Sequence, residues 1–390
     1  MDAFQEQDLF GTTGDPVSLP REYLPRPAEY FQPETIILSK GSLSTPEREH
    51  FVRRICSLYP NARLEMRLDM PHSRIDLKEA DPERLYRKGK TTLVFGELKS
   101  AVRRSEEEGN TCPNYWHFSV YGFCPYGCRY CYLSGTQGVW FSPTVKIHLN
   151  LSEIIREIDR QANRLATPTA FYLGKLQDGL ALDPLTGYST VLIPFFAWHP
   201  YARQIILTKS DSVERLLELD HGGNTILSWS LNPPEFAERY ESNVPPVERR
   251  IAAMERCAER GYPVRAVVMP VVAHGDWIRL YSNFLQNLLS RVNVQRLTLG
   301  GICIYKHARL LMEGWLGRDN VISRNIADGQ PRADGRARYS PEFRATLYTR
   351  LIAAARSVRP DLEIALCLDE PPVWRMVNSR HKLGRCNCVL

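Results

Sequence analysis

Three cysteines lie within eight positions of one another in the stretch YGFCPYGCRYCYLSGTQG, residues 121–138. Proline and glycine separate Cys124 from Cys128, which indicates a loop rather than a core strand or helix. Thiolates bind soft metals, so Cys124, Cys128 and Cys131 could hold zinc or an iron–sulfur cluster. A structural zinc site needs four ligands, whereas three thiolates on a four-iron cluster leave one iron open to another molecule. The spacing therefore predicts a metal centre on these cysteines, with zinc and a distant fourth cysteine as the alternative.

Strand-like and helix-like segments alternate on either side of this loop and along most of the chain. Short apolar runs predict strands at 115–122, 170–174, 203–208, 224–231, 264–272, 295–304 and 362–368. Helical patterns separate most of them, and this alternation predicts parallel βαβ units. We therefore expect an α/β fold with a partial (β/α)6-type barrel over residues 113–377. Active sites of such barrels lie at the C-terminal ends of the strands, and the cysteine loop follows the first strand.

The segments outside the barrel differ from it in composition. Residues 1–30 lack apolar periodicity and are expected to form a flexible arm, followed by a small N-terminal α/β extension over 31–112. Residues 378–390 form a basic C-terminal tail that carries Cys386 and Cys388 as a C-x-C pair. Such a pair could bind a soft metal or act as a redox couple. If the tail folded over the barrel mouth, it could also present a thiol to a substrate radical.

Composition is that of an ordinary globular protein. The 390 residues are 43% hydrophobic and 24% charged, with a formal net charge of +6. No apolar run is long enough to cross a membrane, and the start MDAFQEQDLF lacks the order of a secretory signal. We therefore expect a cytoplasmic location with no membrane partner, where cysteines serve as thiols or metal ligands rather than disulfides. The modest positive charge permits a nucleic-acid partner without requiring one.

The cysteines follow the pattern C-x-x-x-C-x-x-C, and an aromatic residue precedes the last of them. This pattern after the first strand of a barrel resembles that of the radical S-adenosylmethionine (SAM) superfamily. The resemblance implies a [4Fe–4S] cluster on Cys124, Cys128 and Cys131, with SAM bound to the open iron. It also implies that one electron from an external donor of the flavodoxin or ferredoxin type cleaves SAM. The resulting 5′-deoxyadenosyl radical abstracts hydrogen from a substrate inside a barrel that excludes water.

A narrower resemblance, over roughly residues 85–377, is to the spore photoproduct lyase family. It is carried in order by CRYCYL, LTKSDSVERLLEL, SWSLNP, ERRIAAMERCAERGYPVRAVVMPVV and LCLDEPPVWRMV. The resemblance implies that Lys209 binds the SAM carboxylate, a role that suits a point charge. It further implies that Ser230 hydrogen-bonds SAM and that Asn232 supports it. The stretch GKLQDGLALD would add contacts to SAM, with Gly174, Gln177 and Asp178 as the expected residues.

Some of these residues also have simpler interpretations. In TKSDS, Lys209 could be a solvated residue before a helix that Ser210 or Asp211 caps. Tyr130 and Tyr132 flank Cys131 and could pack against a cluster. By the resemblance, they could instead relay a hydrogen atom.

The chain departs from the lyase pattern at one position. The lyases carry a hydrogen-donating cysteine on the loop after the second strand, and the matching residue here is Lys175. An amine N–H is a far poorer hydrogen-atom donor than a thiol. Cys303 and Cys367, on late strands, and the tail pair Cys386 and Cys388 are the candidate replacements.

We therefore expect a radical SAM enzyme that is similar to spore photoproduct lyase but does not itself repair thymine dimers. Its substrate would be either a nucleic-acid lesion or a small metabolite or peptide. The alternatives are a lyase that repairs a DNA lesion and a non-catalytic protein whose cysteines bind zinc or sense oxidation.

Overall fold

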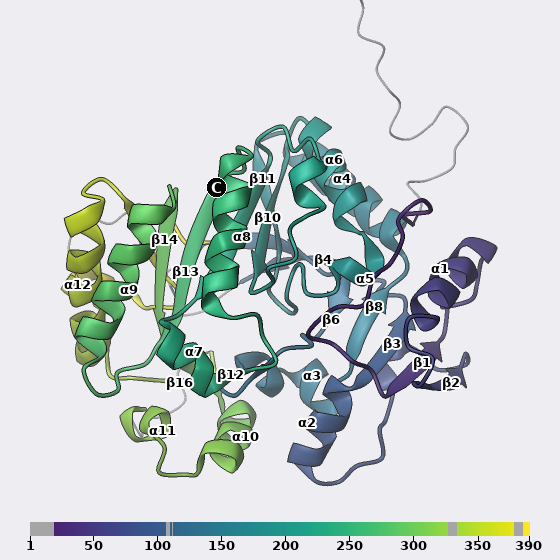
Figure 1. Ribbon diagram of the computed structural model, residues 1–390, viewed down its shortest axis with the longest axis horizontal. Helices are drawn as coiled ribbons and strands as arrows, with labels where there is room; N and C mark the ends of the chain where they lie inside the picture. The colour runs from purple at the N-terminus through teal and green to yellow at the C-terminus, as the bar shows by residue number, and fades with distance from the viewer. Residues whose placement is uncertain (1–18, 107–109, 111, 327–333, 378–384) are drawn as a thin grey trace, which may run out of the picture.

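The computed structural model describes residues 19–106, 110, 112–326, 334–377 and 385–390. A strongly curved eight-stranded sheet forms its centre, with strand order β17-β14-β13-β11-β10-β9-β5-β4 (Figure 1). The strands are β4 (Val102–Ser105), β5 (Tyr115–Phe118), β9 (Thr169–Leu173), β10 (Ala202–Thr208), β11 (Thr225–Leu231), β13 (Val264–Val271), β14 (Arg296–Gly301) and β17 (Glu363–Leu366). Neighbours from β5 to β17 are parallel, and β4 pairs antiparallel with β5. Each predicted strand of the barrel is confirmed.

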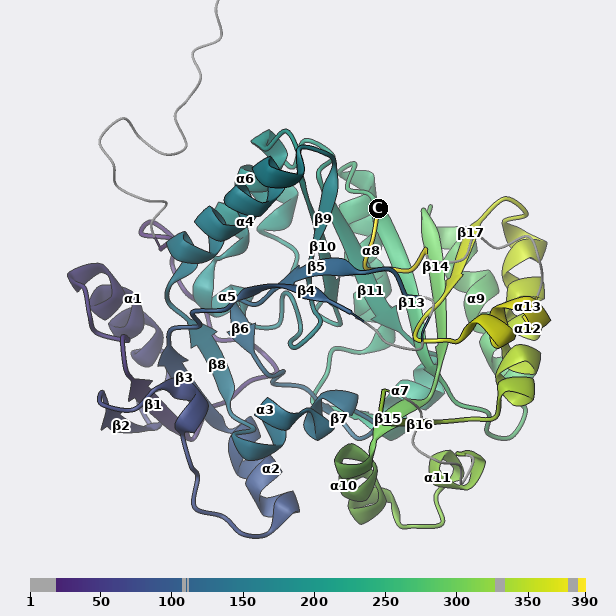
Figure 2. The same ribbon diagram turned by 180° about the vertical axis from the view of Figure 1, so that it is seen from behind.

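Helices cover the outer face of this sheet, as its βαβ connections require (Figures 1 and 2). They include α4 (Leu151–Leu165), α6 (Ser189–Trp198), α8 (Val247–Glu259), α9 (Trp277–Arg291) and α12 (Pro341–Val358). In α4, Ile154, Ile155, Ile158 and Ala162 are buried, so the apolar stripe of the helix faces the sheet. The protein is an α/β partial barrel, which confirms the predicted fold class.

A second, five-stranded sheet lies beside the barrel, with strand order β2-β1-β3-β8-β6 (Figure 1, right). Its strands are β1 (Thr35–Ser39), β2 (Arg63–Arg67), β3 (Thr92–Gly96), β6 (Tyr121–Gly122) and β8 (Val145–His148). The helices α1 (Pro46–Cys56) and α2 (Pro82–Lys90) connect the first three strands. The two sheets do not separate at residue 112. β4 precedes it but belongs to the barrel, whereas β6 and β8 follow it but belong to the smaller sheet. The division into segments 31–112 and 113–377 stays a prediction.

The two ends of the described chain are both packed against the rest of the protein. Of the predicted arm over 1–30, residues 19–30 are described, and Leu19, Tyr23 and Ala28 are buried. Of the predicted tail, residues 385–390 are described. Cys388, Val389 and Leu390 pack on a buried cluster of Tyr115, Ala170, Tyr172, Ile205 and Ile226. The rest of both segments lies outside the described residues.

The tail does not lie over the barrel mouth, as its sequence allowed. Arg265 and Arg296, near the starts of β13 and β14, donate hydrogen bonds to its carbonyl groups, so it enters from the opposite end of the strands. In both views the chain ends beside β11 and β13 (Figures 1 and 2). Among the described residues, none of the helices combines the length and hydrophobicity needed to cross a membrane.

Candidate active site

The cysteine loop leaves the smaller sheet through β6 and runs along the mouth of the barrel. Its centre, β7 (Gly127–Cys128), pairs antiparallel with β12 (Glu241–Ser242), so that Cys128 lies opposite Glu241. Gly127 permits this approach, since a Cβ atom there would lie only 2.6 Å from Ser242 Oγ. The loop is therefore fixed by backbone contacts to the segment after β11.

A cavity of about 220 Å³ extends from this loop into the barrel. It is lined by the three thiols of the motif and by most of the other predicted site residues: Cys124, Cys128, Cys131, Tyr130, Tyr132, Gly174, Gln177, Asp178, Lys209, Ser230 and Cys388. Asn232 and Cys386 are buried but do not line it. The structure thus brings most of the expected residues to one cavity, which the tail thiol reaches from the opposite end of the strands.

The three thiols suit a cluster better than a single ion. Within the described residues, no three His, Cys, Asp or Glu side chains are placed to bind one metal ion. The thiolates of an iron–sulfur cluster bind different irons, so they need not converge on one point. Burial raises the pKa of Cys128 to about 12 and raises that of Cys124 as well. Both thiols therefore stay protonated until a metal displaces the protons.

Lys90, at the end of α2, is a site residue that the motif search missed. Its ammonium group donates hydrogen bonds to the carbonyl oxygens of Cys124 (2.5 Å) and Tyr126 (2.6 Å). It also lies 3.8 Å from the centre of the Phe123 ring. A buried positive charge thus holds the cysteine loop, next to where an anionic cluster would bind.

Lys209 is buried and paired, so it is not the solvated residue of the simpler interpretation. Its ammonium group lies 2.6 Å from Glu241 and 3.1 Å from the hydroxyl of Tyr130, and its side chain is 12% exposed. Arg250 on α8 binds the other oxygen of Glu241 at 2.6 Å. Burial alone would raise the pKa of Glu241, but Lys209 and Arg250 lower it to about 2. Tyr130 completes this network by donating to Glu241, so its hydroxyl is held beside Lys209.

The loop after β9 is organised by Asp178. One of its carboxylate oxygens accepts from Thr208 Oγ1 at 2.7 Å, and the other accepts from the Lys209 backbone N–H at 2.7 Å. Gln177 donates to the carbonyl of Phe118, while its own Oε1 is buried without a partner. Gly174 begins this loop at φ +136°, a conformation that favours glycine.

Ser230 and Asn232 alternate at the end of β11. Ser230 faces the cavity, whereas Asn232 is fully buried and accepts a hydrogen bond from Tyr281 at 3.1 Å. The Nδ2 of Asn232 has no partner among the described residues. A buried polar group without a partner is costly, and of the two unpaired amides only that of Gln177 belongs to a residue that lines the cavity.

Lys175, at the position of the lyases' cysteine, points toward the edge of the sheet. Its ammonium group contacts Ser105 Oγ on β4 and lies 5.2 Å from the centre of the Tyr115 ring. Its backbone carbonyl accepts a hydrogen bond of 2.8 Å from the hydroxyl of Tyr132. The lysine thus has structural contacts, and Tyr132 is held beside it.

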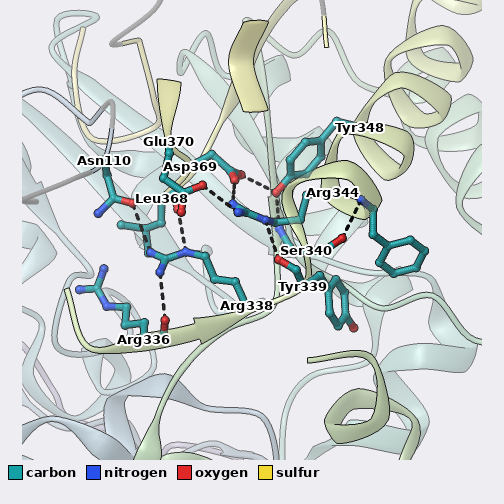
Figure 3. Close-up of polar contacts among 12 residues, drawn as sticks. Asn110, Arg336, Arg338, Tyr339, Ser340, Arg344, Tyr348, Leu368, Asp369 and Glu370 are labelled. Atoms are coloured by element: carbon teal, nitrogen blue, oxygen red, sulfur yellow. Dashed lines mark hydrogen bonds and ion pairs between the residues drawn. The ribbon is translucent and has the colours of Figure 1, made fainter. Parts of the chain in front are cut away.

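The far wall of the cavity contains Cys303, Cys367 and Leu368. An ionic network fixes the segment that follows Cys367 (Figure 3). Arg344 binds both Asp369 and Glu370, and Tyr348 donates to Asp369 at 2.5 Å. This wall therefore has a rigid support made by α12.

An open α/β barrel whose mouth carries three cysteines around a cavity defines the class of radical SAM enzymes. Within that class, the chain belongs to the spore photoproduct lyase family, whose model matches residues 31–302. The predicted resemblance is thereby confirmed, and with it an enzyme whose family uses a [4Fe–4S] cluster and SAM.

Relatives support this membership. The spore photoproduct lyase of Bacillus subtilis is 25% identical over 261 residues, which are 66% of this chain and 73% of the relative. That of Clostridium acetobutylicum is 26% identical over 266 residues, 67% of this chain and 75% of the relative.

Solved structures show the same fold. A spore photoproduct lyase complexed with dinucleoside spore photoproduct has a TM-score of 0.73 at 21% identity, covering 86% of this chain and 98% of that one. A doubly substituted variant with bound AdoMet and the same dinucleoside has a TM-score of 0.74, also at 21% identity, covering 87% of this chain and 99% of that one.

Proposed function

We propose that this protein generates a radical in the cavity and uses it to abstract hydrogen from a bound substrate, in a reaction other than thymine-dimer repair. The bound cluster and SAM would supply the radical, and residues of this chain hold both and shield them from water. The observation that carries the proposal is Lys175. It occupies the position of the lyases' hydrogen donor and is engaged with Ser105 and Tyr115 instead.

The residues divide into three roles in this proposal. Cys124, Cys128 and Cys131 hold the cluster. Gly174, Gln177, Asp178, Lys209, Ser230 and Asn232 surround SAM. Lys209 would bind the SAM carboxylate while it keeps its ion pair with Glu241. Tyr130 would stabilise that pair through its hydroxyl group. Tyr132 and the tail thiols, Cys386 and Cys388, are the proposed groups for hydrogen transfer.

The substrate class has two candidates. Solved relatives bind dinucleoside spore photoproduct, which favours a nucleic-acid lesion of another kind. The cavity of about 220 Å³, with the tail seated in the barrel, favours a small metabolite or a peptide side chain. A low-potential flavodoxin or ferredoxin would deliver the electron in the cytoplasm.

Anaerobic reconstitution with iron and sulfide tests the proposal. The chain should become brown and form 5′-deoxyadenosine from SAM and dithionite. With dinucleoside spore photoproduct as the probe, it should release no repaired dinucleotide. Formation of that product at the rate of the Bacillus subtilis enzyme would overturn the assignment, and a colourless chain with one bound zinc would support the non-catalytic alternative.

A further inference from the structure

The C-terminal tail binds at a specific site inside the barrel, which Arg265 and Arg296 form. Arg265 donates to the carbonyls of Asn387 (3.2 Å) and Val389 (2.6 Å). Arg296 donates to the carbonyls of Cys386 (2.7 Å) and Val389 (2.9 Å). Both guanidinium groups are buried, and a buried charge is costly unless it is hydrogen-bonded. The tail is thus part of the folded barrel rather than a loose end.

This site places the tail's thiols at the cavity. Cys388 lines the cavity, and Cys386 is buried behind it. Cys112, from a segment remote in the sequence, lines the same cavity. Thiols from two remote segments, Cys112 and Cys388, therefore lie at the wall of one reaction space.

Tyr172 lies between this wall and the cysteine loop. It is on β9, three residues before Lys175, and packs in the same cluster as Cys388. Burial raises the pKa of its hydroxyl well above the usual value, and the neighbouring Cys388 and Tyr132 add to this shift. Its ring makes an edge contact with Tyr115 at 5.9 Å. Tyr132, Tyr172 and Cys388 all line the cavity, so their O–H and S–H groups belong to the wall of one space.

We propose that Cys388 is the terminal hydrogen-atom donor of this enzyme and that Tyr172 connects it to Tyr132. The inference rests on the proposed function and names the group that replaces the missing cysteine. Nothing in the residue spacing reveals it, because 213 positions separate Lys175 from Cys388.

The transfer balances without an oxidant. A carbon radical takes the phenolic hydrogen of a tyrosine, forming one C–H bond and breaking one O–H bond. The tyrosyl oxygen then takes the hydrogen of Cys388, which restores the O–H bond and leaves a thiyl radical. One electron from the low-potential donor and one proton from water restore the thiol.

Deuterium labelling tests this path without knowledge of the substrate. In D2O the S–H and O–H groups exchange, so the reconstituted chain given SAM and dithionite alone should form 5′-deoxyadenosine that carries one deuterium. Cys388→Ser and Tyr172→Phe should form labelled 5′-deoxyadenosine only in the first turnover and then stop, because the tyrosine that gave its hydrogen is not reloaded by the thiol. Cys56→Ser, on α1 and away from the cavity, is the matched control and should continue to form the labelled product.

A second readout follows the radical itself. After one turnover, Cys388→Ser should accumulate a tyrosyl radical in the EPR spectrum, because the tyrosines can no longer be reduced by the thiol. In the cluster-free chain, N-ethylmaleimide should modify Cys388 before the buried Cys386. Unlabelled product from the wild-type chain, or continued turnover in both variants, overturns the proposal. Absence of any 5′-deoxyadenosine would instead refute the proposed function on which it rests.

Discussion

The two ends of the cavity are built from different kinds of contact. At the cysteine loop, buried charges hold the backbone: Lys90 binds two carbonyls, and Glu241 lies between Lys209 and Arg250. At the tail, uncharged thiols and phenols face the cavity, and the charges of Arg265 and Arg296 are turned toward the tail's backbone. The end that would hold an anionic cluster thus has positive charges nearby, whereas the other end has O–H and S–H groups that can donate hydrogen atoms.

Only one half of the site carries the motif that identifies the family. The cysteine loop carries it, whereas the thiol at the other end comes from the C-terminal tail. Substitutions at the two ends should therefore affect different measurements.

Cys128→Ala should have the largest effect, because it removes one of three cluster ligands. We expect loss of the brown chromophore and of 5′-deoxyadenosine formation, measured by absorbance and chromatography. Cys56→Ala is the control and should retain both. A brown, SAM-cleaving Cys128→Ala variant would mean that the loop is not the cluster site.

Glu241→Gln should destabilise the protein next most, since it leaves Lys209 and Arg250 buried without their anion. Breaking such a pair costs about 3–5 kcal/mol, which denaturant unfolding of the cluster-free chain would measure. The exposed pair of Glu248 with Arg291 provides the control, and Glu248→Gln should cost less than about 1 kcal/mol. Equal losses in the two variants would show that the Glu241 network does not support the loop.

Lys90→Met should have a smaller effect with two parts. Loss of the hydrogen bonds to the loop carbonyls should cost about 1–3 kcal/mol. Loss of the nearby positive charge should also make the reduction potential of the cluster more negative, as an EPR-monitored titration would show. Lys88→Met, on the exposed side of the same helix, should leave the potential unchanged.

Acid should act through Glu241 only at low pH. The pKa of Glu241 in the folded state is about 2, below its unfolded value of about 4.3. Its stabilising contribution is therefore complete above the unfolded value and is lost as the pH falls toward 2. Unfolding free energies of wild type and Glu241→Gln should converge over that window, and a constant difference down to pH 2 would contradict the assignment.

Lys175→Cys should have the smallest effect on the wild-type chain, because Cys388 already donates hydrogen. In a Cys388→Ser background, however, the substitution should restore 5′-deoxyadenosine formation beyond the first turnover, because residue 175 also lines the cavity. No recovery would show that a thiol at this position does not reduce the tyrosyl radical.

The sequence predicted most of the barrel and the cysteine loop, because strand periodicity and the C-x-x-x-C-x-x-C spacing are local signals. It did not predict Lys90 or Glu241, which lie in other segments and approach the loop only through tertiary pairing. The sequence did not single out Tyr172 for a different reason. A tyrosine inside an apolar strand is usually predicted to be a packing residue of the core. The binding site of the tail was also missed, since the arginines that bind it lie at the starts of strands and interact with backbone groups.

One mass spectrum tests both ends of the cavity together. Wild type and Cys388→Ser, each reconstituted and given SAM and dithionite in D2O, should both form deuterium-labelled 5′-deoxyadenosine in the first turnover, because the loop end and the tyrosines are intact in both. Only the wild type should continue to form the labelled product in later turnovers. Equal continued turnover of the two chains would contradict the division between a loop that generates the radical and a tail that ends it.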